Sequence, residues 1–150
     1  MKNVFDQKET AEILERIEQL SPSSQPLWGK MNVAQMLAHC NVSYELVYEE
    51  KHPKPNFLMK FMLKIFVKDT VVGDKPYQKN SQTAPMFLIV DERDFEVEKT
   101  RLVNYINKTL SLGEAYFDGK ASHSFGVLSK TEWSNMFAKH LDHHLTQFGV

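Results

Sequence analysis

The last stretch of the chain places two histidines four residues apart on the apolar side of a predicted helix. Its sequence is TEWSNMFAKHLDHHLTQFGV, residues 131–150. At about 100° per residue, His140 and His144 fall on one narrow stripe with Trp133, Phe137 and Gln147. Because the aromatic residues of that stripe must face a core, both imidazoles are predicted to point inward, one helical turn apart. Two imidazoles at this spacing can bind one Zn²⁺, Ni²⁺ or Fe²⁺ ion together.

A metal ion held by that pair needs a third ligand, and His39 is the best candidate. It lies in the middle of a second predicted helix, AQMLAHCNVSYE, on a stripe with Ser43. Three neutral imidazoles would leave coordination positions for water or substrate, which is typical of catalytic rather than structural metal sites. Periodicity does not show that His39 faces the pair, however. Three core histidines with ordinary hydrogen bonds are the alternative.

Several residues near these histidines could complete a site. His143 is predicted either beside the ligands or as a half-buried residue at the rim of the bundle. Gln147 could orient an imidazole or a bound water, or it could cap the helix end. Ser43 shares the stripe of His39, and Trp133 is either a core anchor or part of a pocket for an apolar ligand. No Ser-His-Asp or Cys-His arrangement can be assembled, so catalytic residues stay unassigned.

Four long helices are predicted to position these side chains. Their apolar residues recur with helical spacing over about residues 8–20, 32–50, 91–110 and 129–149. Residues 69–90 and 112–126 show no sustained period and are predicted to be long loops. The sequence therefore predicts an all-α fold in a single domain, residues 1–150, built as a four-helix bundle with long connecting loops.

Capping signals indicate where two of these helices begin. Asn32 is followed three residues later by Gln35, and Ser129 is followed at the same spacing by Glu132. Both pairs are typical of a capping box, in which each side chain bonds the backbone N–H of the other residue. The helix that carries His39 and the last helix are therefore predicted to start at these positions.

Residues 56–68, NFLMKFMLKIFVK, predict a short extra helix that is strongly apolar, with lysines at positions 60, 64 and 68. This helix could cover the bundle, form a contact in a dimer, or lie on a membrane surface with its lysines at the headgroups. Its short length and modest positive charge favour the first interpretation, a helix laid on the bundle.

Composition limits the classes of function. The chain has 150 residues, 42% of them hydrophobic, which is enough for one core. Its 18 basic and 19 acidic residues give a net charge of −1 without long runs of either sign, so no nucleic-acid interface is expected. Cys40 is the single cysteine and cannot form an internal disulfide. No signal peptide and no stretch long enough to span a membrane is recognised, so a cytoplasmic location is expected.

Two blocks of the sequence, LWGKMNVAQMLAHC and HSFGVLSKTEWSNMFAKHLDHHLTQFG, resemble the DinB-like superfamily, and in particular a branch catalogued as a domain of unknown function. The resemblance spans nearly the whole chain. It implies a four-helix bundle, often dimeric, that binds a divalent metal ion, often nickel or zinc. In the superfamily one histidine of the second helix and an HxxxH pair of the last helix hold the ion. His39, His140 and His144 occupy those positions here.

The resemblance also bears on function. Some members of the superfamily use a low-molecular-weight thiol such as bacillithiol, mycothiol or glutathione. The resemblance therefore implies a metal-dependent thiol transferase that acts on small electrophiles, or a related hydrolase. The alternative is a non-enzymatic metal- or ligand-binding protein of a stress response. A small-molecule substrate and a second copy of the chain are the expected partners, and no nucleic acid is expected.

Overall fold

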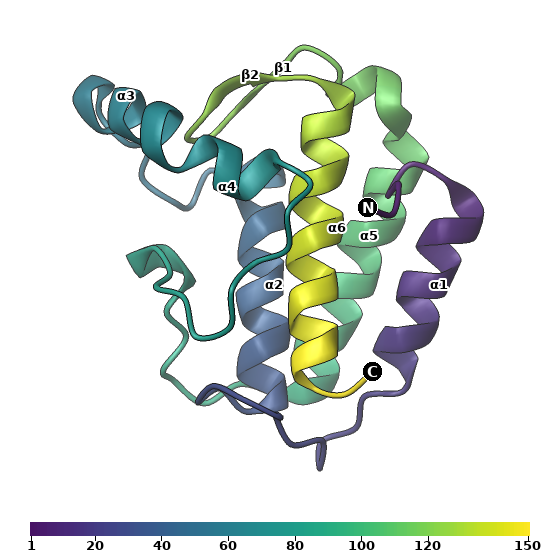
Figure 1. Cartoon of the computed structure of the whole chain (residues 1–150). Helices are drawn as coiled ribbons and strands as arrows, with labels where there is room; N and C mark the ends of the chain where they lie inside the picture. The colour runs from purple at the N-terminus through teal and green to yellow at the C-terminus, as the bar shows by residue number, and fades with distance from the viewer.

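The computed structural model describes all 150 residues and is mostly helical (Figure 1). It has six α-helices, one 3₁₀ turn and a two-stranded antiparallel hairpin, which confirms a predominantly α-helical chain. The elements in chain order are α1 (Gln7–Glu18), α2 (Val33–Tyr48), α3 (Phe57–Phe66), α4 (Lys68–Val72), η1 (Pro85–Phe87), α5 (Phe95–Phe117), β1 (Lys120–Ser122), β2 (Gly126–Leu128) and α6 (Lys130–Gln147).

The four long helices α1, α2, α5 and α6 pack side by side around one hydrophobic core (Figure 1). Helix α2 is the most enclosed, because twelve of its sixteen residues are buried against α5, α6 and η1. A helix that is apolar on nearly every side is expected at the centre of a domain. The buried polar side chains of α2 therefore have to find their partners inside the protein.

Both predicted capping boxes are present. The Asn32 side chain accepts from the Gln35 backbone N–H at the start of α2, and the Gln35 side chain accepts from the Asn32 N–H. Ser129 and Glu132 make the same pair of bonds at the start of α6. Because these bonds satisfy N–H groups that a helix start leaves free, they define where each helix begins.

The segment predicted as a loop over residues 112–126 is largely structured. Helix α5 continues to Phe117 across a kink at Gly113, where φ is 70° and ψ is 171°. A glycine allows this break, and the chain returns to helix because the fully buried Phe117 ring packs against Trp133 and Phe137. The hairpin follows directly, and the Trp133 indole N–H donates to the Lys120 carbonyl at 3.4 Å.

The prediction that the short extra helix is laid on the bundle is wrong, because no residue of α3 is buried. The chain instead forms two short helices, and α3 extends outward from the body while α4 lies against α6 (Figure 1). The buried Lys139 of α6 fastens α4 in place by donating to the carbonyls of Thr70 and Gly73. None of the helices combines the length and hydrophobicity that crossing a membrane requires.

The outward side of α3 carries seven large apolar residues whose exposed fractions lie between 45% and 87%. We call this surface the α3 apolar face; it consists of Phe57, Leu58, Met59, Phe61, Met62, Ile65 and Phe66.

Candidate metal centre

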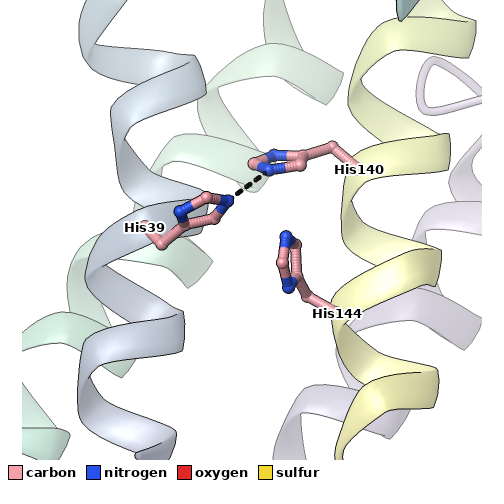
Figure 2. Close-up of side chains that lie close together, drawn as sticks. All are labelled: His39, His140 and His144. Carbon is pink, nitrogen blue, oxygen red and sulfur yellow. Dashed lines mark hydrogen bonds between the residues drawn. The ribbon is translucent and has the colours of Figure 1, made fainter. Parts of the chain in front are cut away.

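Helices α2 and α6 bring three histidines together in the interior (Figure 2). His39 projects from α2, and His140 and His144 project from successive turns of α6. One ring nitrogen from each residue lies within 4.8 Å of the other two, and the three ring centroids are 4.5–4.9 Å apart. We call this cluster the histidine triad.

Burial keeps the three imidazoles neutral. His39 and His144 are buried residues, and the ring of His140 is buried as well although that residue as a whole is only partly so. Loss of hydration lowers the pKa of His39, lowers that of His140 well below its usual value, and lowers that of His144 to about 3. A neutral imidazole has one nitrogen with a free lone pair, which is the form that binds a metal ion.

Hydrogen bonds assign which nitrogen of His39 and of His144 has the lone pair. Nδ1 of His39 lies 2.8 Å from the carbonyl of Phe87, which can only accept, so Nδ1 carries the hydrogen. The Gln147 amide nitrogen donates to the Trp28 carbonyl at 2.7 Å, which turns the amide oxygen toward Nδ1 of His144 at 2.8 Å. Nδ1 of His144 therefore donates too. Both residues keep their lone pair on Nε2.

His140 differs because its Nδ1 partner is a hydroxyl, which can donate or accept. Ser43 Oγ lies 2.8 Å from Nδ1 of His140, and Nε2 of His140 lies 2.9 Å from Nε2 of His39. If the hydroxyl donates, the His140 Nε2–H donates to His39 and no cation is needed. If the hydroxyl accepts, two Nε2 lone pairs face each other at 2.9 Å, an arrangement that a cation between them would stabilise.

The donor set fits a first-row divalent metal ion. Zinc–imidazole bonds are about 2.0–2.1 Å long, so nitrogens bound to one ion stand roughly 3–4 Å apart. The triad has one separation of 2.9 Å and none above 4.8 Å, so small rotations of the rings would suffice. Each Nδ1 also has its own partner, which is how protein metal sites orient histidine ligands.

The family model for DUF1569, described as a protein of unknown function, matches residues 2–149. The chain belongs to the DUF1569 family. The match covers α1 through α6 and contains all three histidines of the triad. No curated protein and no solved structure matches the chain.

Aromatic rings surround the triad in this DUF1569 chain. The Phe87 ring packs against His39 and His140 with centroids 5.2 and 5.6 Å apart, and Tyr77 lies edge-on to His140. Sequence reasoning did not identify Phe87 or Tyr77, because both lie in the aperiodic segment 69–90. The length of that segment was its only signal of function. Burial raises the pKa of Tyr77 to about 12, so its hydroxyl stays protonated at neutral pH.

His143 lies next to the triad without joining it. Its ring is 5.0 Å from that of His144 and makes edge contacts with Trp28 and Tyr77 at 5.8 and 5.7 Å. The side chain is half-buried, as expected of a residue at the rim of the site. His143 therefore lies at the edge of the site, in contact with His144, Trp28 and Tyr77.

Trp133 and Cys40 of the DUF1569 chain are both engaged in the core. Trp133 packs against Phe117 and Phe137 and bonds the hairpin, so its contacts are those of a core anchor. Cys40 is buried, and its thiol contacts Met36 rather than the triad. Burial raises the pKa of the Cys40 thiol, which keeps it protonated and unsuited to metal binding.

Proposed function

We propose that this protein binds one divalent metal ion through Nε2 of His39, His140 and His144. The observation that supports this most strongly is the pattern of hydrogen bonds around the triad. Phe87, Ser43 and Gln147 each engage one Nδ1, so the three Nε2 atoms are left to face a common point.

We also propose that the helices form a four-helix bundle of the DinB-like type. The four long helices around one core support this assignment, as does the origin of the three histidines in α2 and α6. A single domain over residues 1–150 and the homodimer that the resemblance implies are parts of the same proposal.

The metal content of the purified protein tests the proposal. The untagged chain, isolated without added metal and then incubated with Zn²⁺, Ni²⁺ or Mn²⁺, is expected to retain about one ion per chain after gel filtration. Mass spectrometry of the native protein and elemental analysis both measure this ratio. A chain that stays metal-free under all three conditions contradicts the proposal, and the triad is then a hydrogen-bonded core cluster.

The finer proposal is that the protein is a metal-dependent transferase that joins a small thiol to an electrophilic molecule. An ion on three imidazoles would act as a Lewis acid that lowers the pKa of a water or thiol beside it. In the reaction a bond forms between the thiol sulfur and an electrophilic carbon, the S–H proton goes to solvent, and the leaving group takes the bonding electron pair. Phe87, Tyr77 and Trp28 would exclude water around the reactants.

A non-enzymatic metal-binding protein is the second candidate. The close packing of Phe87 and Tyr77 against His140 favours it, because these rings cover the triad in this structure. Cobalt-loaded protein distinguishes the two candidates through its visible spectrum. Glutathione is expected to change the spectrum if the site admits thiols, whereas glutathione disulfide serves as the matched control. A spectrum that no thiol changes favours the non-enzymatic candidate.

Gln147→Leu is expected to weaken metal binding about 10- to 100-fold while leaving the fold intact. The amide oxygen of Gln147 orients the His144 ring, and loss of such an orienting hydrogen bond typically reduces metal affinity by that factor. Competition with a chromophoric chelator measures the affinity. Gln7→Leu, at an exposed position of α1, is the control. Equal affinities for the two variants would show that Gln147 does not orient His144.

Gly29→Ala should have the same effect through a different residue. Gly29 has a φ of +84°, and a Cβ added there would lie 2.4 Å from Nε2 of Gln147. The alanine therefore strains the backbone and displaces the amide that holds His144. Because Gln147 itself is unchanged in this variant, weaker metal binding would show that the orientation of the Gln147 amide affects the site.

A further inference from the structure

The α3 apolar face is larger than a monomeric soluble protein normally exposes. A fully exposed large apolar side chain presents about 200 Å². With the observed exposed fractions, the seven residues together present roughly 800 Å², whereas the largest apolar patch of a typical monomer is about 300–600 Å². A surface of this size on a single short helix indicates a binding function.

The apolar residues cover more than half of the circumference of α3. At about 100° per residue, the α3 apolar face runs from Phe57 around to Met59 over about 200°. The remaining arc holds Leu63, which is partly buried, and the two lysines Lys60 and Lys64. A helix that packs on one core or one partner helix needs an apolar stripe of only about 100°. A broad surface such as a lipid boundary contacts a wider arc.

The charge of this region has one sign. Residues 51–68 contain five lysines and no acidic residue. Lys51 pairs with Glu45 and Glu49, and Lys68 pairs with Glu132. Lys54, Lys60 and Lys64 form no ion pair. These three charges beside the α3 apolar face are complementary to an anionic surface.

We propose that α3 binds the surface of a bilayer that contains anionic phospholipids. The α3 apolar face enters the boundary between headgroups and acyl chains, and Lys54, Lys60 and Lys64 contact the phosphates. This combination of an apolar face and flanking lysines is typical of helices that lie in the membrane interface. A second copy of the chain fits less well, because α3 would meet an equally basic α3 and would cover only part of the apolar arc.

The placement of α3 suits this role. The helix extends away from the body, so a flat surface can reach its outer side (Figure 1). Helix α4, which Lys139 fastens to α6, connects α3 to the rest of the protein. The histidine triad lies between α2 and α6, so the proposed lipid contact through α3 uses none of its residues.

Flotation with lipid vesicles tests the proposal on the untagged 150-residue chain. The protein is mixed with vesicles of phosphatidylcholine alone or of phosphatidylcholine with phosphatidylglycerol, and light scattering gives its oligomeric state without lipid. The protein is expected to float with the anionic vesicles at low salt and to be released by high salt, and to bind pure phosphatidylcholine much more weakly.

Matched variants assign this binding to α3. Phe61→Ser combined with Ile65→Ser should weaken binding roughly 10- to 100-fold, and Lys60→Gln combined with Lys64→Gln roughly 30-fold. The controls remove exposed apolar or basic side chains elsewhere: Val90→Ser with Val97→Ser, and Lys30→Gln with Lys75→Gln. All eight positions are exposed or only partly buried, so the melting temperature should change little, and a circular dichroism melt checks this.

Two results would overturn the proposal. The first is a wild-type protein that binds neither kind of vesicle. Such a protein could be a stable dimer in solution, which the Phe61 and Ile65 substitutions would convert to monomer. In that case a second copy occupies the α3 apolar face. The second is vesicle binding that the control variants reduce as strongly as the α3 variants, which would assign the binding to general charge or hydrophobicity.

Discussion

His140→Ala should reduce the affinity for Zn²⁺ or Ni²⁺ by at least about a hundredfold, so that the purified variant retains almost no metal. Removal of a residue that only orients a ligand already costs about 10- to 100-fold in affinity, and removal of a ligand costs more. His140 lies close to both other members of the triad, with its Nε2 2.9 Å from Nε2 of His39 and its ring centroid 4.8 Å from that of His144. His39→Ala and His144→Ala should have the same effect.

His143→Ala is the matched control for this experiment. It removes an imidazole from the same helix, 5.0 Å from the ring of His144, but not from the triad. Its affinity should stay within a few-fold of the wild-type value in the same chelator competition. Far-UV circular dichroism verifies that each alanine variant remains folded. Full metal occupancy in all three triad variants would rule out the triad as the site. A loss of metal affinity in His143→Ala as large as in the triad variants would show that the effect is not confined to the three proposed ligands.

Arg101→Met should lower the free energy of unfolding by about 2–4 kcal/mol at neutral pH. The Arg101 guanidinium donates to Glu45 of α2 at 2.5 Å and to Glu98 of α5 at 2.8 Å. Both carboxylates are buried, with 4% exposure each, so the variant leaves two buried negative charges without their shared partner. Removing one partner of a fully buried pair costs about 3–5 kcal/mol, and the 30% exposure of the Arg101 side chain reduces this value.

Urea denaturation measures this loss, and Lys99→Met on the same helix is the control. Lys99 pairs with the exposed Glu18, and ion pairs at the surface contribute about 1 kcal/mol or less. A loss in Arg101→Met no larger than in Lys99→Met would show that other groups compensate the two carboxylates. Lys51, His52 and Arg93 are the neighbours that could do so.

The loss in Arg101→Met should shrink in acid. Burial raises the pKa of Glu45, but hydrogen bonds from Lys51, His52 and Arg101 outweigh burial, and the pKa lies below the usual 4.5. The ionised Glu45 therefore stabilises the fold above pH 4.5, and this contribution disappears as pH falls through the folded pKa. Without Arg101 the carboxyl protonates more readily, so the two stabilities should converge below pH 4.5. A difference that is constant with pH would assign the loss to packing of the Arg101 side chain.

Sequence alone determined what lies within a single helix. The spacing of His140 and His144 with Phe137 predicted that both imidazoles point into the core, and the structure has them there. The capping boxes at Asn32 and Ser129 were predicted correctly for the same reason. These features depend on the fixed rotation of about 100° per residue and on bonds between residues three positions apart, both of which can be inferred from the order of residues.

Tertiary structure decided which helices and loops meet. The helical period gives the direction of His39 around α2 but not the direction of α2 relative to α6, which depends on packing throughout the core. From its own spacing, His39 was therefore only a candidate for the third metal ligand. The resemblance to the DinB-like superfamily was the one further argument for it. The Phe87 carbonyl that orients His39 comes from a segment without a period, so no pattern indicated it.

The same limit explains the wrong prediction for α3. An apolar face shows that a helix has a surface to bury, but it does not identify what covers that surface. The strong apolar pattern of residues 57–66 fits burial on the helical body and exposure to an external partner equally well. Attachment of α4 to α6 through Lys139 sets the direction in which α3 leaves the body, and these contacts join residues more than sixty positions apart. Interactions over such distances in the chain are not encoded in any local pattern, so only the folded structure determines them.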